Sequence, residues 1–123
     1  MLKLNSLLIG SEDPEQLAAF YGEVLQSKPG WQGGGYTGYQ AGDAYLMIGP
    51  HDKVHGRSQN PERIIFNFET ADVRAEFDRI KAIEGSTIVR EPYNPGDNES
   101  STLLLATLAD PDGNYFQLAT PMQ

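Results

Sequence analysis

Apolar and polar residues follow two periods along this chain, one typical of strands and one typical of helices. The stretch 2–9 is mostly apolar and strand-like. Asp13 and Pro14 follow, which is typical of a helix start because proline fits the first helical position. Behind them lies a stripe of apolar residues at helical spacing: Leu17, Phe20, Tyr21 and Val24. We therefore expect a strand over 2–9 and a helix that begins at Pro14, packs on a sheet and ends before Gly30.

The middle of the chain, from 31 to 49, is rich in glycine and tyrosine and is predicted to form a meander of short strands. Gly33-Gly34-Gly35 has no lysine or serine behind it at the spacing of a phosphate-binding loop, so we interpret it as a hairpin tip. A polar stretch over 50–61 then leads to a second half with the plan of the first. The elements expected there are a strand over 63–70, a helix between Asp72 and Gly85, a strand over 87–91, a polar loop over 92–100 and a final hairpin.

The final hairpin is predicted by the tetrapeptide Asp110-Pro111-Asp112-Gly113. The proline fixes φ for the first turn position, the first aspartate can accept a backbone hydrogen bond inside the turn, and the glycine takes a positive φ at little cost. Apolar and polar residues alternate in the strand that follows, so Phe116 and its neighbour two residues on should face the core.

This hairpin resembles the last one of the vicinal oxygen chelate superfamily, which includes glyoxalases, bleomycin resistance proteins and extradiol dioxygenases. The opening stretch 5–25 is also similar to that superfamily, with Glu12-Asp13 before the helix and Ala19-Phe20-Tyr21 inside it. The resemblance implies an α+β fold of two βαβββ modules that form a curved mixed sheet around a cleft, with the helices on the convex face.

The module boundaries follow from the same pattern. We expect one domain over 1–123, with modules at about 1–49 and 62–123 and a connection over 50–61. The predicted helix starts, Asp13 and Asp72, lie about half the chain apart, which fits a duplicated module.

Composition narrows the classes of function. The formal charge of −8, from 17 acidic and 9 basic residues, opposes binding to nucleic acid and favours a cationic small molecule or plain solubility. Cysteine is absent, which excludes disulfides, thiol nucleophiles and thiolate metal sites. The apolar run 7–9 is too short for a signal peptide or a membrane span, so we expect a cytoplasmic protein with no membrane partner.

The chemistry of the superfamily usually depends on a divalent metal held by His and Glu side chains on the concave face. The resemblance places the four ligand positions at Ser6, Met47, Ile65 and Gln117. None of them offers the imidazole or carboxylate that zinc, nickel, iron or manganese needs. His51 and His55 lie in a predicted loop, where they do not share a helix face. We therefore expect no metal and no cofactor.

Strand alternation predicts an apolar cleft with aromatic walls instead. One parity, which includes Ile64, is expected to face the helices, and the other is expected to face the cleft. Glu69 has the cleft-facing parity and is a weak candidate for a catalytic base, although a carboxylate at a strand end is more often a rim charge. The candidate ligand-binding residues are Ser6, Trp31, Tyr36, Tyr39, Tyr45, Met47, Ile65, Asn67, Tyr93, Tyr115 and Gln117.

Three functions are compatible with this pattern. The favoured one is a metal-independent small-molecule-binding protein, similar to the bleomycin resistance branch, that sequesters an antibiotic or another toxic aromatic compound, preferably a cationic one. The alternative is a metal-independent isomerase or lyase that uses Glu69 or a tyrosine as acid or base. A sensory or scaffolding role is the third. Because the superfamily commonly shares its cavities between two chains, the resemblance also implies a symmetric homodimer.

Overall fold

The computed structural model describes residues 1–96 and 102–121 of the chain. The chain divides into two compact units, Met1–Gly56 and Arg57–Gln123. In the described residues each unit contains one helix and one four-stranded sheet, and both run in the order strand, helix, strand, strand, strand. The α+β class and the two βαβββ modules predicted from the sequence are therefore confirmed.

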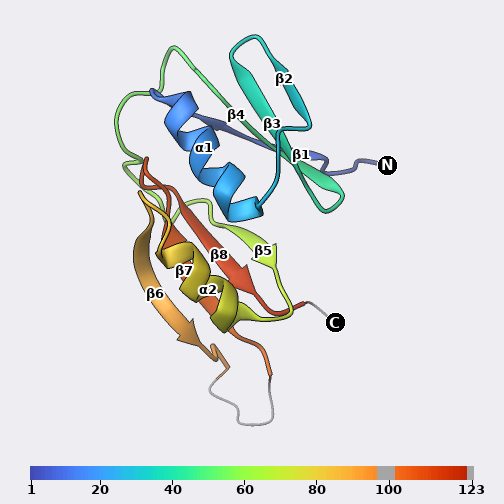
Figure 1. Cartoon of the computed structure of the whole chain (residues 1–123), viewed down its shortest axis with the longest axis vertical. Coiled ribbons are helices and arrows are strands. Elements are labelled where there is room, and N and C mark those ends of the chain that lie inside the picture. Colours follow the sequence, from blue (N-terminus) through green and yellow to red (C-terminus); the bar gives the residue numbers. More distant parts are fainter. Residues whose placement is uncertain (97–101, 122–123) are drawn as a thin grey trace. The chain divides into compact units, whose positions relative to one another are not determined.

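The first unit has the strand order β1-β4-β3-β2 (Figure 1). Strand β1 runs parallel to β4, and the other pairs are antiparallel. Helix α1 covers one face of this sheet, mainly over β3 and β4. The elements are β1 (Ser6–Gly10), α1 (Pro14–Leu25), β2 (Trp31–Gly33), β3 (Tyr36–Ala41) and β4 (Ala44–Gly49).

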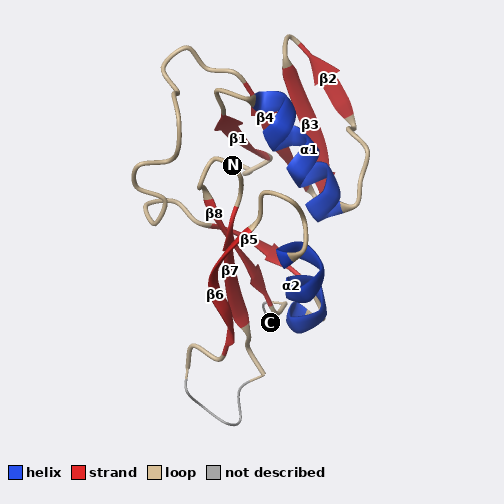
Figure 2. Cartoon of the chain, turned by 60° about the vertical axis from the view of Figure 1, so that its left-hand side comes forward, coloured by secondary structure: helices blue, strands red, loops and turns tan. Residues whose placement is uncertain are grey.

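The second unit repeats the arrangement with the strand order β5-β8-β7-β6 (Figure 2). Strand β5 runs parallel to β8, and β6, β7 and β8 pair in antiparallel fashion. Helix α2 covers one face, in contact with β6, β7 and β8. The elements are β5 (Phe66–Glu69), α2 (Val73–Lys81), β6 (Thr87–Tyr93), β7 (Leu105–Ala109) and β8 (Tyr115–Ala119).

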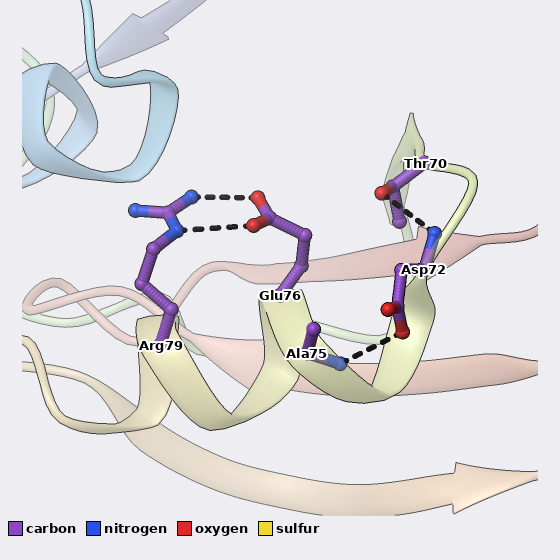
Figure 3. A network of polar contacts seen from close by, with 5 residues as sticks. All are labelled: Thr70, Asp72, Ala75, Glu76 and Arg79. Carbon is purple, nitrogen blue, oxygen red and sulfur yellow. Dashed lines mark hydrogen bonds and ion pairs between the residues drawn. The ribbon is translucent and has the colours of Figure 1, made fainter.

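Both helices begin where the sequence predicted. The Asp13 carboxylate accepts a hydrogen bond from the Gln16 backbone N–H at 3.2 Å, which satisfies a donor that the first turn leaves free. Asp72 does the same for Ala75 at 3.1 Å, and the Thr70 hydroxyl oxygen accepts from the backbone N–H of Asp72 (Figure 3). The predicted apolar stripe of α1 is buried against its sheet.

The closing turn also forms as predicted. Asp110 is almost completely buried, and one of its carboxylate oxygens accepts from the backbone N–H groups of Asp112 at 2.9 Å and Asn114 at 3.0 Å. Gly113 has a φ of 82°, a conformation that a side chain would strain. The turn therefore fixes the register of β7 against β8, with Leu108 opposite Phe116.

Several predicted boundaries were wrong. Strand β1 begins at Ser6 rather than at residue 2, because its partner strand β4 begins only at Ala44 and offers no pairing further back. The end of helix α1 is consistent with the prediction, since the helix ends at Leu25, where Gln26 adopts a left-handed conformation, and therefore before Gly30. The predicted loop over 92–100 is described only to residue 96, and its first two residues belong to β6.

The prediction that Ile64 faces a helix was also wrong. It precedes β5 and is 69% exposed, so it does not face a helix as predicted. The reason is that β5 pairs with β8 only from Phe66 onward, opposite Phe116, and strand alternation does not extend to residues before the pairing starts.

Candidate functional site

Each sheet has one face covered by its helix and one face without a helix, which we call the open face. Residues opposite each other on neighbouring strands share a face, and successive residues of a strand alternate between faces. Leu46 and Ile48 are buried on the side of α1, so Tyr45 and Met47 lie on the open face of the first sheet. Ser6, the register partner of Tyr45, belongs to the same face.

Four predicted residues gather on this face and form what we call the aromatic platform: Trp31, Tyr36, Tyr45 and Met47. Trp31 pairs with Gly38, which pairs in turn with Met47, so the three residues form a row across three strands. Leu8, next to Met47 on β1, extends the platform. Trp31 is 50% exposed and Leu8 is 57% exposed, so both side chains are accessible from solvent.

Glycines let the platform side chains lie down on the sheet. The Tyr36 ring fills the space that a Cβ of Gly49 would need, and the Tyr36 hydroxyl donates to the carbonyl of Pro50 at 2.9 Å. A Cβ on Gly38 would lie 2.7 Å from the Met47 sulfur. Gly33 lies two residues after Trp31 on β2, and a Cβ on Gly33 would lie 3.2 Å from the Trp31 indole ring. The side chains of Tyr36, Met47 and Trp31 can therefore lie close to the strands only because glycine leaves this space unfilled.

Tyr39 lies elsewhere than predicted. It pairs with Leu46 on the helix-covered face, is 4% exposed, and donates its hydroxyl to the carbonyl of Ala18 in α1 at 2.8 Å. Burial raises the pKa of this phenol. Tyr39 and Tyr36 are three residues apart on one strand, an odd number, so they face opposite sides of the sheet. Tyr39 is a core residue and not part of the open face.

The open face of the second sheet is polar. Phe116 and Leu118 are buried on the side of α2, so Tyr115 and Gln117 point away from the helix. Asn67 pairs with Gln117 and shares its face, and Glu69 follows two residues later on the same strand. Both are exposed.

Two residues of this face were not among the sequence-based candidates. Thr107 pairs with Gln117, whose side-chain amide donates to the Thr107 hydroxyl oxygen at 3.1 Å. Arg90 pairs with Thr107 and stacks its guanidinium 3.4 Å from the ring centre of Tyr93. Strand β6 has register shifts on both sides of Arg90, so simple alternation in the sequence does not reveal which face it occupies.

Ile65 is the remaining candidate. It lies just before β5 and is half-buried, so it belongs to no strand pair. The structure thus brings together five candidates on the first open face and four on the second, with Tyr93 at the β6 edge. The first five are Ser6, Trp31, Tyr36, Tyr45 and Met47, and the others are Asn67, Glu69, Tyr115 and Gln117.

The donor set on these faces does not fit a metal. The four positions at which the resemblance predicts metal ligands are Ser6, Met47, Ile65 and Gln117, and their side chains offer a hydroxyl, a thioether, an alkyl group and a neutral amide. Their register partners add a phenol, Tyr45, and an alkyl group, Leu8, to the first sheet and a neutral amide, Asn67, to the second. Within residues 1–96 and 102–121, no three His, Cys, Asp or Glu side chains cluster in a way that would hold an ion.

Residues 6–119 match the model of a glyoxalase-like domain family. No curated protein matches the sequence. Neither described helix is long and apolar enough to cross a membrane.

Solved structures share the fold at low sequence identity. A glyoxalase-related enzyme from Fulvimarina pelagi superposes with a TM-score of 0.77 at 21% identity, over 98% of this chain and 89% of that chain. A glyoxalase/bleomycin resistance protein/dioxygenase family enzyme from Burkholderia phytofirmans gives 0.75 at 18% identity, over 98% and 100%. The fosfomycin resistance protein FosX from Listeria monocytogenes gives 0.65 at 16% identity, over 99% and 93%.

Proposed function

The chain belongs to the glyoxalase-like domain family of the vicinal oxygen chelate superfamily, and from this premise we propose that it binds a small planar aromatic compound without a metal. The proposed role is sequestration, so that an antibiotic or another toxic compound is held and not converted. One structural neighbour is described as a fosfomycin resistance protein, which supports a resistance role for proteins of this fold.

The aromatic platform carries the proposal. Trp31, Tyr36 and Tyr45 offer π-systems on one sheet face, and the half-exposed Trp31 is accessible to a ligand. Stacking on such side chains contributes about 0.5–1.5 kcal/mol per ring pair beyond the burial of area, and large aromatic side chains are frequent anchors of binding energy. The surrounding Leu8 and Met47 add apolar area, as in most small-molecule sites.

Assembly and location belong to the same proposal. We infer a single functional domain over 1–123 that forms a symmetric homodimer in the cytoplasm. The open face of the first sheet exposes apolar side chains at Leu8 and Trp31, which is consistent with a surface that a partner chain or a ligand covers.

The experiment uses one ring system with three charges, namely 2-naphthoate, 2-naphthamide and 2-naphthylmethylammonium. Trp31 is the only tryptophan, so its indole N–H gives a single NMR signal that reports on the platform. We expect at least one of these probes to shift that signal saturably. Trp31→Ala should weaken calorimetric binding by about 1 kcal/mol or more, and Trp31→Phe, which keeps an aromatic face, should weaken it less.

The outcomes separate the alternatives. If all three probes leave the indole signal unchanged, the platform does not bind aromatic ligands and the proposal is wrong. Preference for the ammonium probe would support the cationic ligand expected from the net charge of −8. New probe signals that grow with time would show turnover and favour the isomerase or lyase.

A further inference from the structure

A row of four polar side chains crosses the open face of the second sheet from edge to edge. Arg90 on β6 pairs with Thr107 on β7, Thr107 pairs with Gln117 on β8, and Gln117 pairs with Asn67 on β5. With neighbouring strands about 4.8 Å apart, the row is about 14 Å long, which matches the size of a small organic molecule. We call these four residues the polar row.

We propose that the polar row binds the oxyanion group of an organic ligand, a carboxylate or a phosphonate, with Arg90 as its charged partner. This inference rests on the proposed ligand-binding role and gives the ligand of the second sheet an anionic group, because Arg90 supplies a local positive charge there although the net charge of the chain is −8. The cationic ligand expected from that net charge concerns the aromatic platform alone. The polar row would bind a charged group of a ligand, whereas the aromatic platform would bind an aromatic ring.

Arg90 is the cation that the row needs. In the described residues, Arg90 forms no ion pair, whereas on α2 of the same unit Arg79 pairs with Glu76 at 2.8 Å and Lys81 pairs with Asp78 at 3.1 Å. The Tyr93 ring, 3.4 Å from the guanidinium carbon, restrains the Arg90 side chain by stacking. A planar guanidinium held in this way retains N–H donors in the fork geometry that a carboxylate or phosphonate accepts.

The other members of the row supply neutral polar groups without a competing charge. The Gln117 amide donates to the Thr107 oxygen, which fixes both side chains and leaves the Thr107 hydroxyl proton free to donate. Asn67 is exposed and carries two further N–H donors. Glu69 shares this face but lies on β5, at the opposite edge of the sheet from β6, so it does not neutralise Arg90.

The test uses the whole chain with benzoate, phenylphosphonate and benzamide as probes. Benzamide has the shape of benzoate without the charge. We expect both anions, but not benzamide, to shift the Arg90 Nε–H signal and the side-chain amide signals of Asn67 and Gln117 saturably. The concentrations at which the benzoate and phenylphosphonate shifts reach half of their maximum show which oxyanion the row prefers.

Two variants with the same change of charge test the role of Arg90. Arg90→Gln should weaken binding of the preferred anion about tenfold or more, because a charge-assisted hydrogen bond is lost. Arg74→Gln, at an exposed position of α2 away from the open face, should leave affinity nearly unchanged. Arg90→Lys keeps the charge but loses the fork, so its affinity should fall between those of Arg90→Gln and the unsubstituted chain.

The proposal is overturned if benzamide binds as well as benzoate, if Arg90→Gln and Arg74→Gln behave alike, or if neither anion gives a saturable shift up to about 10 mM. The Trp31 indole signal distinguishes this failure from that of the proposed function. Shifts at the polar row without any naphthalene effect on Trp31 would support the row and contradict the aromatic platform, and the reverse result would do the opposite.

Discussion

At the scale of single residues, the contact between Tyr39 and Gly22 explains a glycine inside a helix. Gly22 lies within α1, where glycine costs about 1 kcal/mol relative to alanine. A Cβ at this position would lie 2.8 Å from the Tyr39 hydroxyl oxygen. We expect Gly22→Ala to lower the free energy of unfolding by about 1–2 kcal/mol in denaturant titrations, because overpacking outweighs the gain in helix propensity.

A double-mutant cycle isolates this contact. Tyr39→Phe alone should cost about 1 kcal/mol, the value of the hydrogen bond to Ala18. In the Tyr39→Phe background the nearest ring carbon lies 3.3 Å from the added Cβ, so Gly22→Ala should be close to neutral there. Equal effects of Gly22→Ala in both backgrounds would contradict the explanation.

The raised pKa of Tyr39 makes stability depend on pH in the alkaline range. Because burial raises the pKa in the folded state above the ordinary value of about 10, folding favours the protonated phenol. The contribution is fully present below pH 10 and is lost as the pH rises through the folded-state pKa. We therefore expect the free energy of unfolding to fall more steeply above pH 10 in the unsubstituted chain than in Tyr39→Phe, as measured by urea unfolding at several pH values. Parallel pH profiles would contradict this prediction.

At the scale of elements, the start of α2 depends on a short polar network (Figure 3). Asp72 caps the helix, and Glu76 lies one turn after this cap. Arg79 donates from Nε and from a terminal nitrogen to the two carboxylate oxygens of Glu76. Asp72→Ala should lower the free energy of unfolding by about 1 kcal/mol, whereas Asp72→Asn, which keeps an acceptor, should change it by only a few tenths. Thermal or urea unfolding measures both, and equal losses would show that the cap hydrogen bond is not what stabilises the helix start.

The Glu76–Arg79 pair is a weaker feature of the same element. The hydrogen bond from Arg79 lowers the pKa of Glu76, so this pair stabilises the fold above the ordinary carboxyl pKa and ceases to do so as the pH falls through the lowered value. Both side chains are partly exposed, which limits the contribution to a few tenths of a kcal/mol.

Elements governed by local chemistry could be predicted from the sequence. The helix starts at Asp13 and Asp72 and the turn at Asp110 follow from side chains that bond the nearby backbone, and the structure confirms all three. Strand ends could not be predicted in the same way, because they depend on where a partner strand begins. Ile64 lies outside β5 for this reason.

The two open faces were only partly predictable. Leu8 has the same parity as Ser6 on β1, so its place on the aromatic platform was readable from alternation. The odd separation of Tyr36 and Tyr39 also excluded a shared face once both were assigned to one strand. Arg90 was different, since the register shifts in β6 break the alternation and only the pairing with Thr107 shows its face.

At the scale of the whole molecule, the donor chemistry predicts independence from metals. The positions predicted to hold metal ligands are Ser6, Met47, Ile65 and Gln117. They offer a hydroxyl, a thioether, an alkyl group and a neutral amide, none of which holds a transition metal tightly. We expect purified protein to contain no stoichiometric zinc, nickel, iron or manganese, and a chelator to leave its melting temperature unchanged. Elemental analysis decides the first point, and about one tightly bound ion per chain would contradict the prediction.

Assembly is the last property that follows at this scale. Each helix covers only one face of its sheet, and in the first unit the other face exposes Leu8 and Trp31, while Leu2 and Leu4 are exposed just before β1. Removing such apolar area from water contributes about 25 cal/mol per Å², which is the term that favours association of two chains over these side chains. We expect light scattering at tens of micromolar to give twice the chain mass of 13.5 kDa. Leu4→Ser together with Leu8→Ser should shift the mass toward the monomer, whereas Leu103→Ser, at an exposed leucine of the second unit, should not. A monomer mass for the unsubstituted chain at these concentrations would contradict the predicted homodimer.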